Sequence, residues 1–262
     1  MLFSFVIPTY NRSSKIVRAI DSIIVQGNWE RLSEIIVVDD GSTDGTALKL
    51  KPYIEKGQIR FIQHAKNLGV AAAKNTGILN SGNKYVVLLD SDDLLIENGL
   101  HYLENLVLQN RSDLFFCGTK VLNSDRLMYD LNFQGLKSYH DLLRASVGEY
   151  LPVAKTSIMK QNLLHNLRGY ESITWLGLAK KGYQLYFDNE PIRLYDKEGD
   201  DRLSNRFNGI RNASKMKDGY TLYLKEFGLD LKSWNYIEYL KMHIKLFCYD
   251  MMSLSLFKSK GK

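Results

Sequence analysis

Residues 85–93 read Tyr85-Val86-Val87-Leu88-Leu89-Asp90-Ser91-Asp92-Asp93. The first five, all apolar, predict a strand that is buried on both faces, as in an open α/β sheet. Asp90 and Asp92 are two residues apart, so on an extended backbone their side chains point to the same side. Such carboxylates repel each other unless a cation compensates them, and Mg²⁺ or Mn²⁺ prefers oxygen ligands of this kind. Alternatively, Asp92 and Asp93 only begin the next helix, at the positive end of its dipole.

The composition indicates a globular protein with a sizeable core. Its 262 residues suffice for one large domain or two small ones, and the net charge of +6 favours anionic partners. There is no run of 18 apolar residues, and the start of the chain, Met1–Ile7, lacks the features of a signal peptide. Cys117 and Cys248 lie in apolar runs, which predicts free, packed thiols in a reducing compartment. We therefore expect a cytoplasmic protein with no nucleic-acid partner.

Strands and helices alternate through the first hundred residues. We expect strands at Leu2–Ile7 (ended by Pro8), Glu34–Val38, Ile59–Gln63 and Tyr85–Leu89. Helices are expected after a cap at Ser13 or Ser14, at Thr46–Glu55 and in the small-residue stretch Asn67–Gly77. Buried strands that alternate with helices predict an α/β fold with a doubly wound, mostly parallel, Rossmann-like sheet.

The pattern is looser in the second half of the chain. It predicts further strands at Leu114–Gly118, Pro152–Ile158, Tyr183–Phe187 and Ile192–Tyr195. It predicts helices at Glu97–Gln109, Glu171–Lys180, Arg206–Phe227 and Ser233–Leu256. The last two helices are amphipathic and predict a helical C-terminal extension.

Polar residues follow three of the predicted strands. In open α/β sheets, ligands bind beyond the carboxyl ends of the strands, where the strand order reverses. Here Pro8–Asn11, Asp39–Gly41 and Asp90–Asp93 follow three such ends. These residues suit a nucleoside diphosphate. Tyr10 offers an aromatic ring that can stack on a base, Asp40 offers an acceptor for a base N–H, and the Asp90–Asp92 pair can hold a metal. Taken singly, the tyrosine can belong to the core and the aspartate can close a turn.

Five segments carry motifs that are specific in combination: Val6–Arg12, Val37–Thr46, Asn67–Gly69, Lys74–Gly77 and Leu89–Asp93. Together they resemble the family 2 glycosyltransferases of GT-A fold, of the type that acts in bacterial surface-polysaccharide synthesis. The resemblance covers about the first 100 residues. It implies a UDP-sugar donor and a divalent metal, Mn²⁺ or Mg²⁺, bound at a DXD motif.

The resemblance also implies roles for individual residues. Tyr10 and Asp40 would hold the uracil, Asp90 the ribose side, and Asp92 together with Asp90 the metal that bridges the diphosphate. The other donor-binding residues that it implies are Pro8, Thr9, Arg12, Asn67, Lys74, Ser91 and Arg202. Lys74 stands where many relatives have arginine, which keeps the charge but not the bidentate fork. For Arg202 the alternative is a surface salt bridge.

The candidate general base is Glu171. Relatives commonly have a Glu-Asp pair before a helix in the acceptor half, and one of these carboxylates is the base. Here Ser172 replaces the second acid, so the resemblance leaves Glu171, whose alternative role is to stabilise the start of a helix. One base and one displacement, through an oxocarbenium-like state, invert the anomeric centre.

The expected function is inverting transfer of a hexose-type sugar from a UDP-sugar to a saccharide acceptor. The resemblance suggests an acceptor linked to undecaprenyl diphosphate, in O-antigen, capsule or exopolysaccharide synthesis. Residues 1–110 are expected to bind the donor, residues 111–205 the acceptor, and residues 206–262 to form the helical extension. Residues 241–262 hold five lysines, Asp250 and many apolar residues, which predicts peripheral contact with the cytoplasmic face of the inner membrane. The alternative is a helix packed on its own domain.

Two other functions fit parts of the sequence. A haloacid-dehalogenase-like phosphohydrolase has a DxDx(T/V) loop, which Asp90–Asp93 matches loosely. However, Leu94 stands where that loop needs Thr or Val, and the loop should follow the first strand, not the fourth. A non-catalytic sugar-nucleotide binder or scaffold of a polysaccharide assembly complex would keep Asp40 and lose the base. The fold alone does not separate these functions.

Overall fold

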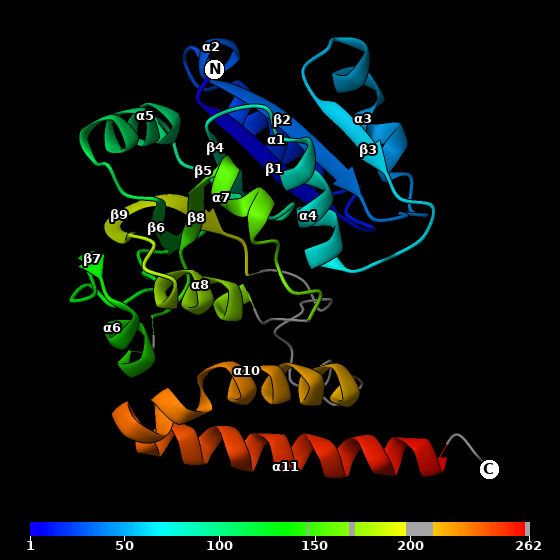
Figure 1. Ribbon diagram of the computed structural model, residues 1–262. Helices are drawn as coiled ribbons and strands as arrows, with labels where there is room; N and C mark the ends of the chain where they lie inside the picture. Colours follow the sequence, from blue (N-terminus) through cyan, green and yellow to red (C-terminus); the bar gives the residue numbers. More distant parts are fainter. Residues whose placement is uncertain (146, 168–170, 198–211, 260–262) are drawn as a thin grey trace. The chain divides into compact units, whose positions relative to one another are not determined.

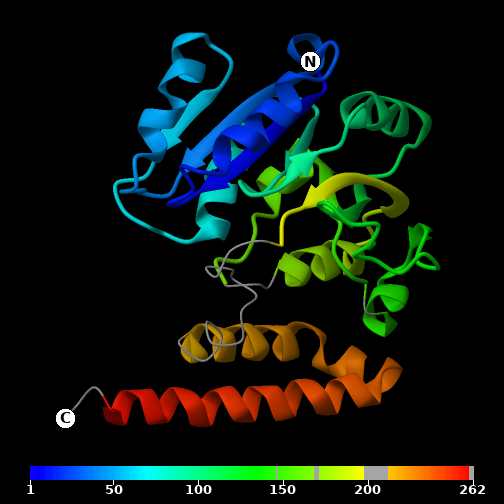
Figure 2. The same cartoon turned by 180° about the vertical axis from the view of Figure 1, so that it is seen from behind.

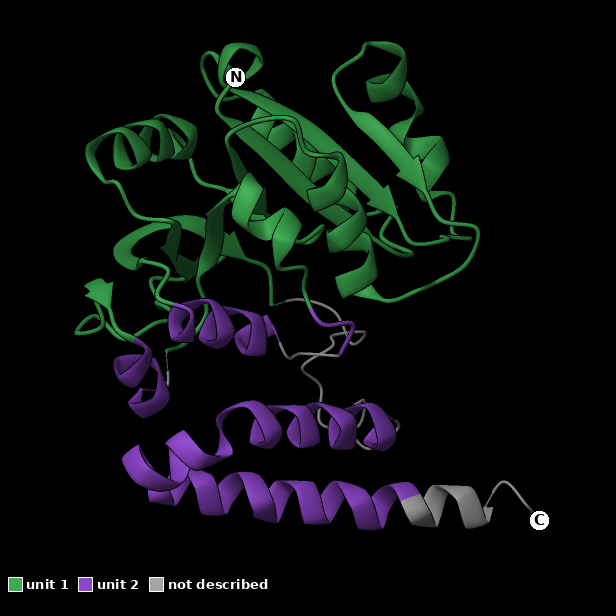
Figure 3. Ribbon diagram, viewed as in Figure 1, with its two compact units in different colours: residues 1–138, 147–164, 182–197 green, residues 139–146, 165–181, 198–262 purple. Residues whose placement is uncertain are grey.

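The computed structural model describes residues 1–145, 147–167, 171–197 and 212–259, without the side chains of residues 254–259. Two compact units divide the chain (Figure 3). Unit 1 consists of Met1–Ser138, Val147–Leu164 and Gly182–Lys197. Unit 2 consists of Tyr139–Ser146, His165–Lys181 and Glu198–Lys262.

Among the described residues, unit 1 contains one nine-stranded sheet (Figure 1). Its strands are β1 (Phe3–Thr9), β2 (Ser33–Asp39), β3 (Arg60–Gln63), β4 (Tyr85–Leu88), β5 (Leu94–Leu95), β6 (Leu114–Val121), β7 (Gly135–Lys137), β8 (Leu151–Lys155) and β9 (Leu185–Tyr195). The strand order is β3-β2-β1-β4-β8-β6-β9-β5, and β7 also pairs with β9. The first four strands are parallel, whereas β8 is antiparallel to both β4 and β6.

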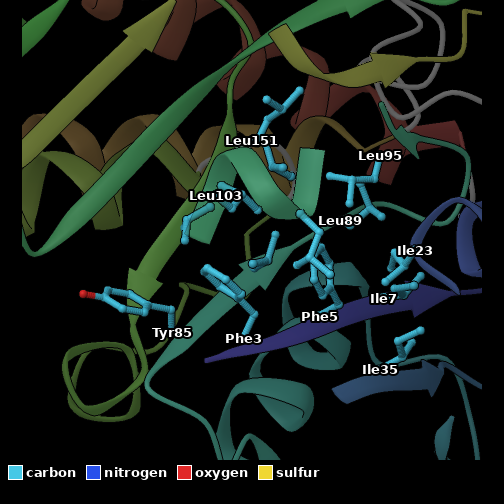
Figure 4. Close-up of a cluster of buried hydrophobic side chains, with 14 of the residues drawn as sticks. Phe3, Phe5, Ile7, Ile23, Ile35, Tyr85, Leu89, Leu95, Leu103 and Leu151 are labelled. Atoms are coloured by element: carbon cyan, nitrogen blue, oxygen red, sulfur yellow. The ribbon is translucent and has the colours of Figure 1, made fainter. Parts of the chain in front are cut away.

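Helices cover both faces of the parallel strands, as the views from the two sides show (Figures 1 and 2). The helices α1 (Ile16–Ile24) and α5 (Gly99–Gln109) share a core with the odd-numbered residues of β1 and β2, including Phe5 and Ile35 (Figure 4). The helix α4 (Val70–Asn80) packs on the opposite face. A Cβ atom at Gly77 would lie 2.2 Å from a methyl group of Val6, so only glycine allows this approach. The predicted doubly wound α/β fold is confirmed.

Three further helices of the described chain belong to unit 1: α2 (Trp29–Leu32), α3 (Thr46–Glu55) and α7 (Thr156–Gln161). The bounds of α3 agree with the prediction. The predicted strand Pro152–Ile158 is wrong at its end, because β8 stops at Lys155 and α7 follows directly. Ile158 is buried as part of that helical turn, so burial rather than strand propensity decided its conformation.

The sequence predicts that Pro8 ends the first strand, but β1 continues to Thr9, and both residues stay in register with β2. β1 pairs with β4 only as far as Val6, whose carbonyl accepts the Leu89 N–H. Backbone groups alternate in direction along a strand, so an N–H at position 8 would point toward β4. It would lie beyond the last residue of β1 that pairs with β4. The missing donor therefore leaves the sheet intact.

Two further expectations about local structure are wrong. Lys15 is at the N-cap of α1 without a side-chain cap, and Ser13 instead donates its N–H to Asp44. The two strands predicted at Tyr183–Phe187 and Ile192–Tyr195 are one strand, β9. Its pairing with β6 shifts register on both sides of Gly118, which places three extra residues in β9 as bulges.

Unit 2 is helical in its described part. Its helices are α6 (Tyr139–Arg144), α8 (Glu171–Lys180), α10 (Ala213–Trp234) and α11 (Tyr236–Ser259). The core of this unit includes Leu143, Ile173, Phe227 and Leu231. The bounds of α8 agree with the prediction, and the predicted helical C-terminal extension corresponds to α10 and α11. Within the described ranges, no helix is both long enough and apolar enough to cross a membrane.

Candidate active site

The carboxyl ends of β1, β2, β3 and β4 lie at one edge of the sheet, because these strands are parallel. The strand order reverses at β1: the chain adds β2 and β3 on one side of it and then returns to add β4 on the other. Ligands of open α/β sheets bind at such a reversal, beyond the strand ends. The residues that follow β1 and β4 are therefore positioned where a ligand is expected.

The turns after β1 and β2 are tied together by side chains. Asn11, with a left-handed φ of 51°, donates its N–H to Ser42 Oγ at 2.8 Å. Ser13 donates its N–H to Asp44 Oδ2 at 3.0 Å. Burial opposes ionisation of Asp44, but hydrogen bonds from Thr46 and Ser13 lower its pKa to about 2. These contacts fix the backbone of both turns.

Asp40 anchors the loop that leads into α4. Its Oδ1 accepts the Leu68 N–H at 2.9 Å, and its Oδ2 accepts the Gly69 N–H at 2.7 Å. The Nδ1 atom of His64 lies 2.8 Å from the same Oδ1, and its Nε2 lies 2.9 Å from Thr76 Oγ1. Asp40 is buried and already holds this loop, so a nucleobase N–H would need one of its remaining lone pairs.

Lys74 reaches Asp90 from α4. Its Nζ lies 2.9 Å from Asp90 Oδ1, and its side chain is 5 % exposed, against 38 % for that of Asp90. Burial opposes ionisation of Asp90, but the Lys74 charge outweighs it and holds the pKa of Asp90 below its ordinary value. Asp90 is therefore a carboxylate that already has a cationic partner.

Asp92 has a weaker partner. Arg12 Nε lies 3.9 Å from Asp92 Oδ2, which is the outer limit of an ion pair. Burial and the charge of Asp90 raise the pKa of Asp92 above its ordinary value, although Arg12 opposes this. A raised carboxylate pKa means that the negative charge is incompletely compensated, and an added cation stabilises such a charge.

Asp93, the third carboxylate of the motif, pairs with β9. It is fully buried, and its Oδ2 lies 3.4 Å from Nη1 of the buried Arg193. Arg193 also donates its Nε–H to Thr119 Oγ1 at 2.9 Å, and the Asp196 N–H donates to Asp93 Oδ1 at 3.3 Å. Burial raises the pKa of Asp93 to about 8, against the opposing charge of Arg193. Asp93 thus ties the turn after β4 to β9.

A divalent metal fits this arrangement in one way. Among the residues that the structure describes, no three His, Cys, Asp or Glu side chains gather as a metal site. Mg²⁺ is, however, commonly held by one or two carboxylates together with substrate phosphates. Asp90 already has Lys74, whereas the charge of Asp92 is incompletely compensated. The donor set therefore fits a metal at Asp92 whose remaining ligands come from a diphosphate.

The other donor-site candidates of unit 1 lie on the same strand ends and loops. Pro8 and Thr9 are the last residues of β1, and Thr9 Oγ1 is buried without a hydrogen-bond partner among the described residues. Tyr10 follows them with 43 % of its surface exposed, so its ring is accessible to a base. Ser91 is buried, and Asn67 is exposed in the loop before α4.

The structure does not test two of the candidates. Glu171 is the first residue of α8 and belongs to unit 2, so the structure leaves its role as a base untested. Arg202 lies outside the described residues.

Sequence reasoning missed two residues that support the site. His64 links Asp40 to α4 and directly follows β3, so the rule that ligand sites gather at strand ends could have found it. Arg193 lies inside β9 and gave no local signal, because its partner Asp93 is 100 positions away in the chain.

The model of the glycosyl transferase family 2 matches residues 4–167, which is more than half of the chain. The chain therefore belongs to family 2 of the glycosyltransferases. This assignment leaves no support for the phosphohydrolase alternative.

Three relatives illustrate the similarity. The chain is 27 % identical over 253 residues to the putative teichuronic acid biosynthesis glycosyltransferase TuaG of Bacillus subtilis, covering 93 % of this chain and 96 % of that protein. It is 27 % identical over 182 residues to WfgD of Escherichia coli, a UDP-Glc:alpha-D-GlcNAc-diphosphoundecaprenol beta-1,3-glucosyltransferase, covering 68 % and 70 %. It is 29 % identical over 224 residues to an uncharacterized glycosyltransferase of Rickettsia felis. This match covers 82 % of this chain but only 35 % of that protein.

Two solved structures share the fold. TarS of Staphylococcus aureus in complex with UDP-GlcNAc superposes with a TM-score of 0.69 at 20 % identity, covering 86 % of this chain and 67 % of that one. The mannosyltransferase PcManGT of Pyrobaculum calidifontis, in complex with GDP-Man and Mn²⁺, has a TM-score of 0.68 at 17 % identity, covering 97 % and 74 %. At these identities the likeness shows the fold alone, and it confirms the predicted GT-A fold.

Proposed function

We propose that this chain transfers a hexose-type sugar from a UDP-sugar to a saccharide acceptor, with inversion at the anomeric carbon. The observation that carries the proposal is the pair of carboxylates after β4, in which Lys74 compensates Asp90 and the charge of Asp92 is left for a metal. This pair lies where strand order reverses in a chain of glycosyltransferase family 2. The alternative of a non-catalytic sugar-nucleotide binder would use the same donor site without turnover.

The proposed donor is a uridine diphosphate sugar. Support comes from WfgD, whose name specifies UDP-Glc, and from TarS, which was solved with UDP-GlcNAc. In this chain, Tyr10 would stack on the uracil and Asp40 would accept its imide N–H, while Asp90 would face the ribose. The further donor contacts that we propose are Pro8, Thr9, Arg12, Asn67, Lys74, Ser91 and Arg202.

Asp92, with Asp90 beside it, would hold the divalent metal, Mn²⁺ or Mg²⁺. When bound, the metal supplies a Lewis acid that neutralises charge on the departing diphosphate. The Mn²⁺ in the PcManGT complex supports metal use on this fold. Arg12, 3.9 Å from Asp92, would add a second positive charge near the same leaving group.

Glu171 is the proposed general base. It would take the proton of the acceptor hydroxyl as that oxygen attacks the anomeric carbon, while the sugar–diphosphate bond breaks on the opposite face. It is the first residue of α8, so its carboxylate lies at the positive end of the helix dipole.

We assign residues 1–110 to donor binding, residues 111–205 to acceptor binding and residues 206–262 to a helical extension. The acceptor that we propose is a saccharide linked to undecaprenyl diphosphate, in bacterial surface-polysaccharide synthesis. The names of WfgD and TuaG support an acceptor and a pathway of this kind. Peripheral contact with the cytoplasmic face of the inner membrane stays a prediction, supported by the five lysines between residues 241 and 262.

The test is a screen of UDP- and GDP-sugars against lipid-diphosphate saccharide acceptors in the presence of Mn²⁺. We expect transfer from a UDP-sugar, with a product of opposite anomeric configuration. Transfer from GDP-sugars alone would contradict the donor assignment. Binding of UDP without transfer or hydrolysis of any donor would favour the non-catalytic alternative.

A further inference from the structure

The helix α11 exposes an apolar series along one side. Ile237, Leu240, Ile244, Phe247 and Met251 have exposed fractions between 44 % and 68 %. We call these five residues the outer seam. Isolated exposed apolar residues are common on soluble proteins, but five on one side of one helix form a contiguous patch, and such patches mark interaction sites.

The outer seam is not required by the core of unit 2. α11 packs against α10 through a different set of residues, the partly buried Tyr239, Met242, Leu246 and Tyr249. Figure 1 shows the two helices running alongside each other. α11 therefore carries two apolar sides, and its own unit covers one of them.

The spacing of the outer seam is that of a coiled coil. Its residues are separated by three, four, three and four positions, which corresponds to a and d positions of a heptad repeat. An apolar stripe this narrow packs against a second helix, whereas a helix that lies on a membrane surface typically has a broader apolar face. The spacing therefore favours a helical partner.

The charges around the seam do not favour an anionic membrane. Residues 236–253 of α11 contain Glu238, Lys241, Lys245 and Asp250, which gives a formal charge of zero. Lys241 pairs with Glu238 at 3.4 Å, and Asp250 pairs with Lys217 of α10 at 2.6 Å. The lysines that support membrane contact lie mainly beyond residue 257, whereas the outer seam occupies the middle of the helix.

The exposed area is sufficient for a specific contact between two copies. Each side chain of the outer seam leaves roughly 100 Å² uncovered, so complete burial of two seams would cover about 1,000 Å² in total, which reaches the lower bound for a specific interface.

We propose that the outer seam binds the outer seam of a second copy of this chain, in an antiparallel helix pair. A parallel pair would bring together the ends at which each chain carries Lys258, Lys260 and Lys262 without an acidic residue. The antiparallel pair separates these ends by the length of the helix, about 36 Å for 24 residues. It also sets the end that carries Glu238 beside the lysine-rich end of the other copy. This inference does not depend on the proposed function.

The antiparallel pair has a defined register. With Ile244 opposite Phe247 of the second copy, Leu240 lies opposite Met251, and every described layer combines an a with a d position. On one flank, position 241 then lies opposite Cys248 of the second copy. On the other flank, His243 lies opposite Asp250 of the second copy, which adds an attractive pair when the histidine is protonated.

The first test is the molar mass of the full chain, measured by light scattering after gel filtration at increasing concentration. We expect twice the chain mass of 30.1 kDa for the wild type and the single-chain mass for the double variant Ile244→Glu/Phe247→Glu. Both positions are exposed in the single chain, so circular dichroism and melting temperature should show that the variant stays folded. The matched control is Leu229→Glu on α10, which is 85 % exposed outside the seam and should remain dimeric.

The second test uses Cys248, which is exposed although the sequence predicts a packed thiol. Under mild oxidation, Lys241→Cys should give a disulfide-linked dimer on a non-reducing gel, because position 241 faces Cys248 of the second copy. Within one chain the two sulfurs are seven residues apart, about 10.5 Å along the helix, too far for a disulfide. The matched variant His243→Cys would cross-link in a parallel pair and should not do so here.

Several results would overturn the proposal. One is a wild-type mass that corresponds to a single chain or to three or more chains. Another is a double variant that remains dimeric. The last is efficient cross-linking of the His243→Cys variant but not of the Lys241→Cys variant. A single-chain wild type that sediments with anionic vesicles, and loses this in the double variant, would assign the seam to a membrane instead.

Discussion

The Nζ atom of Lys74 lies 2.9 Å from Oδ1 of Asp90, and the lysine is buried while the aspartate is partly exposed. This contact separates the roles of two carboxylates that look equivalent in the sequence. Against the effect of burial, the Lys74 charge lowers the pKa of Asp90, whereas burial and the Asp90 charge raise the pKa of Asp92. The asymmetry supports the proposal that Asp92 is the principal metal ligand.

The Lys74–Asp90 pair should contribute to stability. Lys74→Met keeps the length of the side chain but leaves Asp90 without its ammonium partner. We expect a loss of about 1–3 kcal/mol in the free energy of unfolding, at the lower end because water reaches Asp90. Urea denaturation at neutral pH measures this loss.

The controls for this pair are Lys74→Arg and the double variant Lys74→Met/Asp90→Asn. The arginine keeps the charge and should lose less stability. The double variant removes the uncompensated carboxylate and should recover part of the loss, which a double-mutant cycle quantifies. Equal stability of Lys74→Met and the wild type would show that the pair contributes nothing.

Tyr10 should supply a stacking surface for uracil. Base–aromatic stacking contributes about 1–3 kcal/mol, so Tyr10→Ala should weaken UDP binding roughly 5- to 150-fold, whereas Tyr10→Phe keeps the ring and should bind almost normally. Calorimetry with Mn²⁺ present measures both, and it should also show UDP binding much more tightly than GDP. Equal affinities for UDP and GDP would overturn the uridine assignment.

Glu171 should affect transfer but not donor binding. Glu171→Gln keeps the shape of the side chain and removes its basicity, so transfer should fall by about 10²- to 10⁴-fold while UDP affinity is unchanged. Ser172→Ala, at the next position of α8, is the matched control and should retain activity. Undiminished transfer by Glu171→Gln would mean that another acid is the base.

Asp44 should make stability depend on pH in the acid range. Its folded-state pKa of about 2 lies below the value of about 3.9 expected when unfolded, so its contribution is complete above that value and is lost as the pH falls toward 2. The difference in urea midpoint between the wild type and Asp44→Asn should therefore be largest near neutral pH and shrink between pH 4 and pH 3. A difference in urea midpoint that does not change with pH would show that ionisation of Asp44 does not contribute to stability.

The first half of the fold was predictable because its information is local. Buried apolar runs ending in Asp39 and Asp90 marked the parallel strands, and small residues around Gly77 marked a helix packed close to the sheet. The second half depends on pairs distant in sequence. β9 reads as two strands because Pro191 interrupts the pattern, yet pairing with β6 continues across the bulges.

The same distinction holds for the candidate site. The residues on strand ends could be found from the sequence, since the topology of an α/β sheet gathers them. The division of roles between Asp90 and Asp92 could not, because it requires the ammonium of Lys74 to reach across from another element. Nor could the sequence distinguish Asp93, which is buried against Arg193, from its two neighbours in the motif.

The metal site at Asp92 is tested most directly by the rate of UDP release from the donor that the screen identifies. It should be measured for the wild type and for Asp92→Ala, with Mn²⁺ and with excess EDTA. We expect the wild-type rate to fall to background in EDTA and to return when Mn²⁺ is restored. Asp92→Ala should be slower by at least about 100-fold while melting no earlier than the wild type, because it removes a charge that Asp90 repels. Full activity in EDTA, or unchanged turnover by Asp92→Ala, would contradict this assignment.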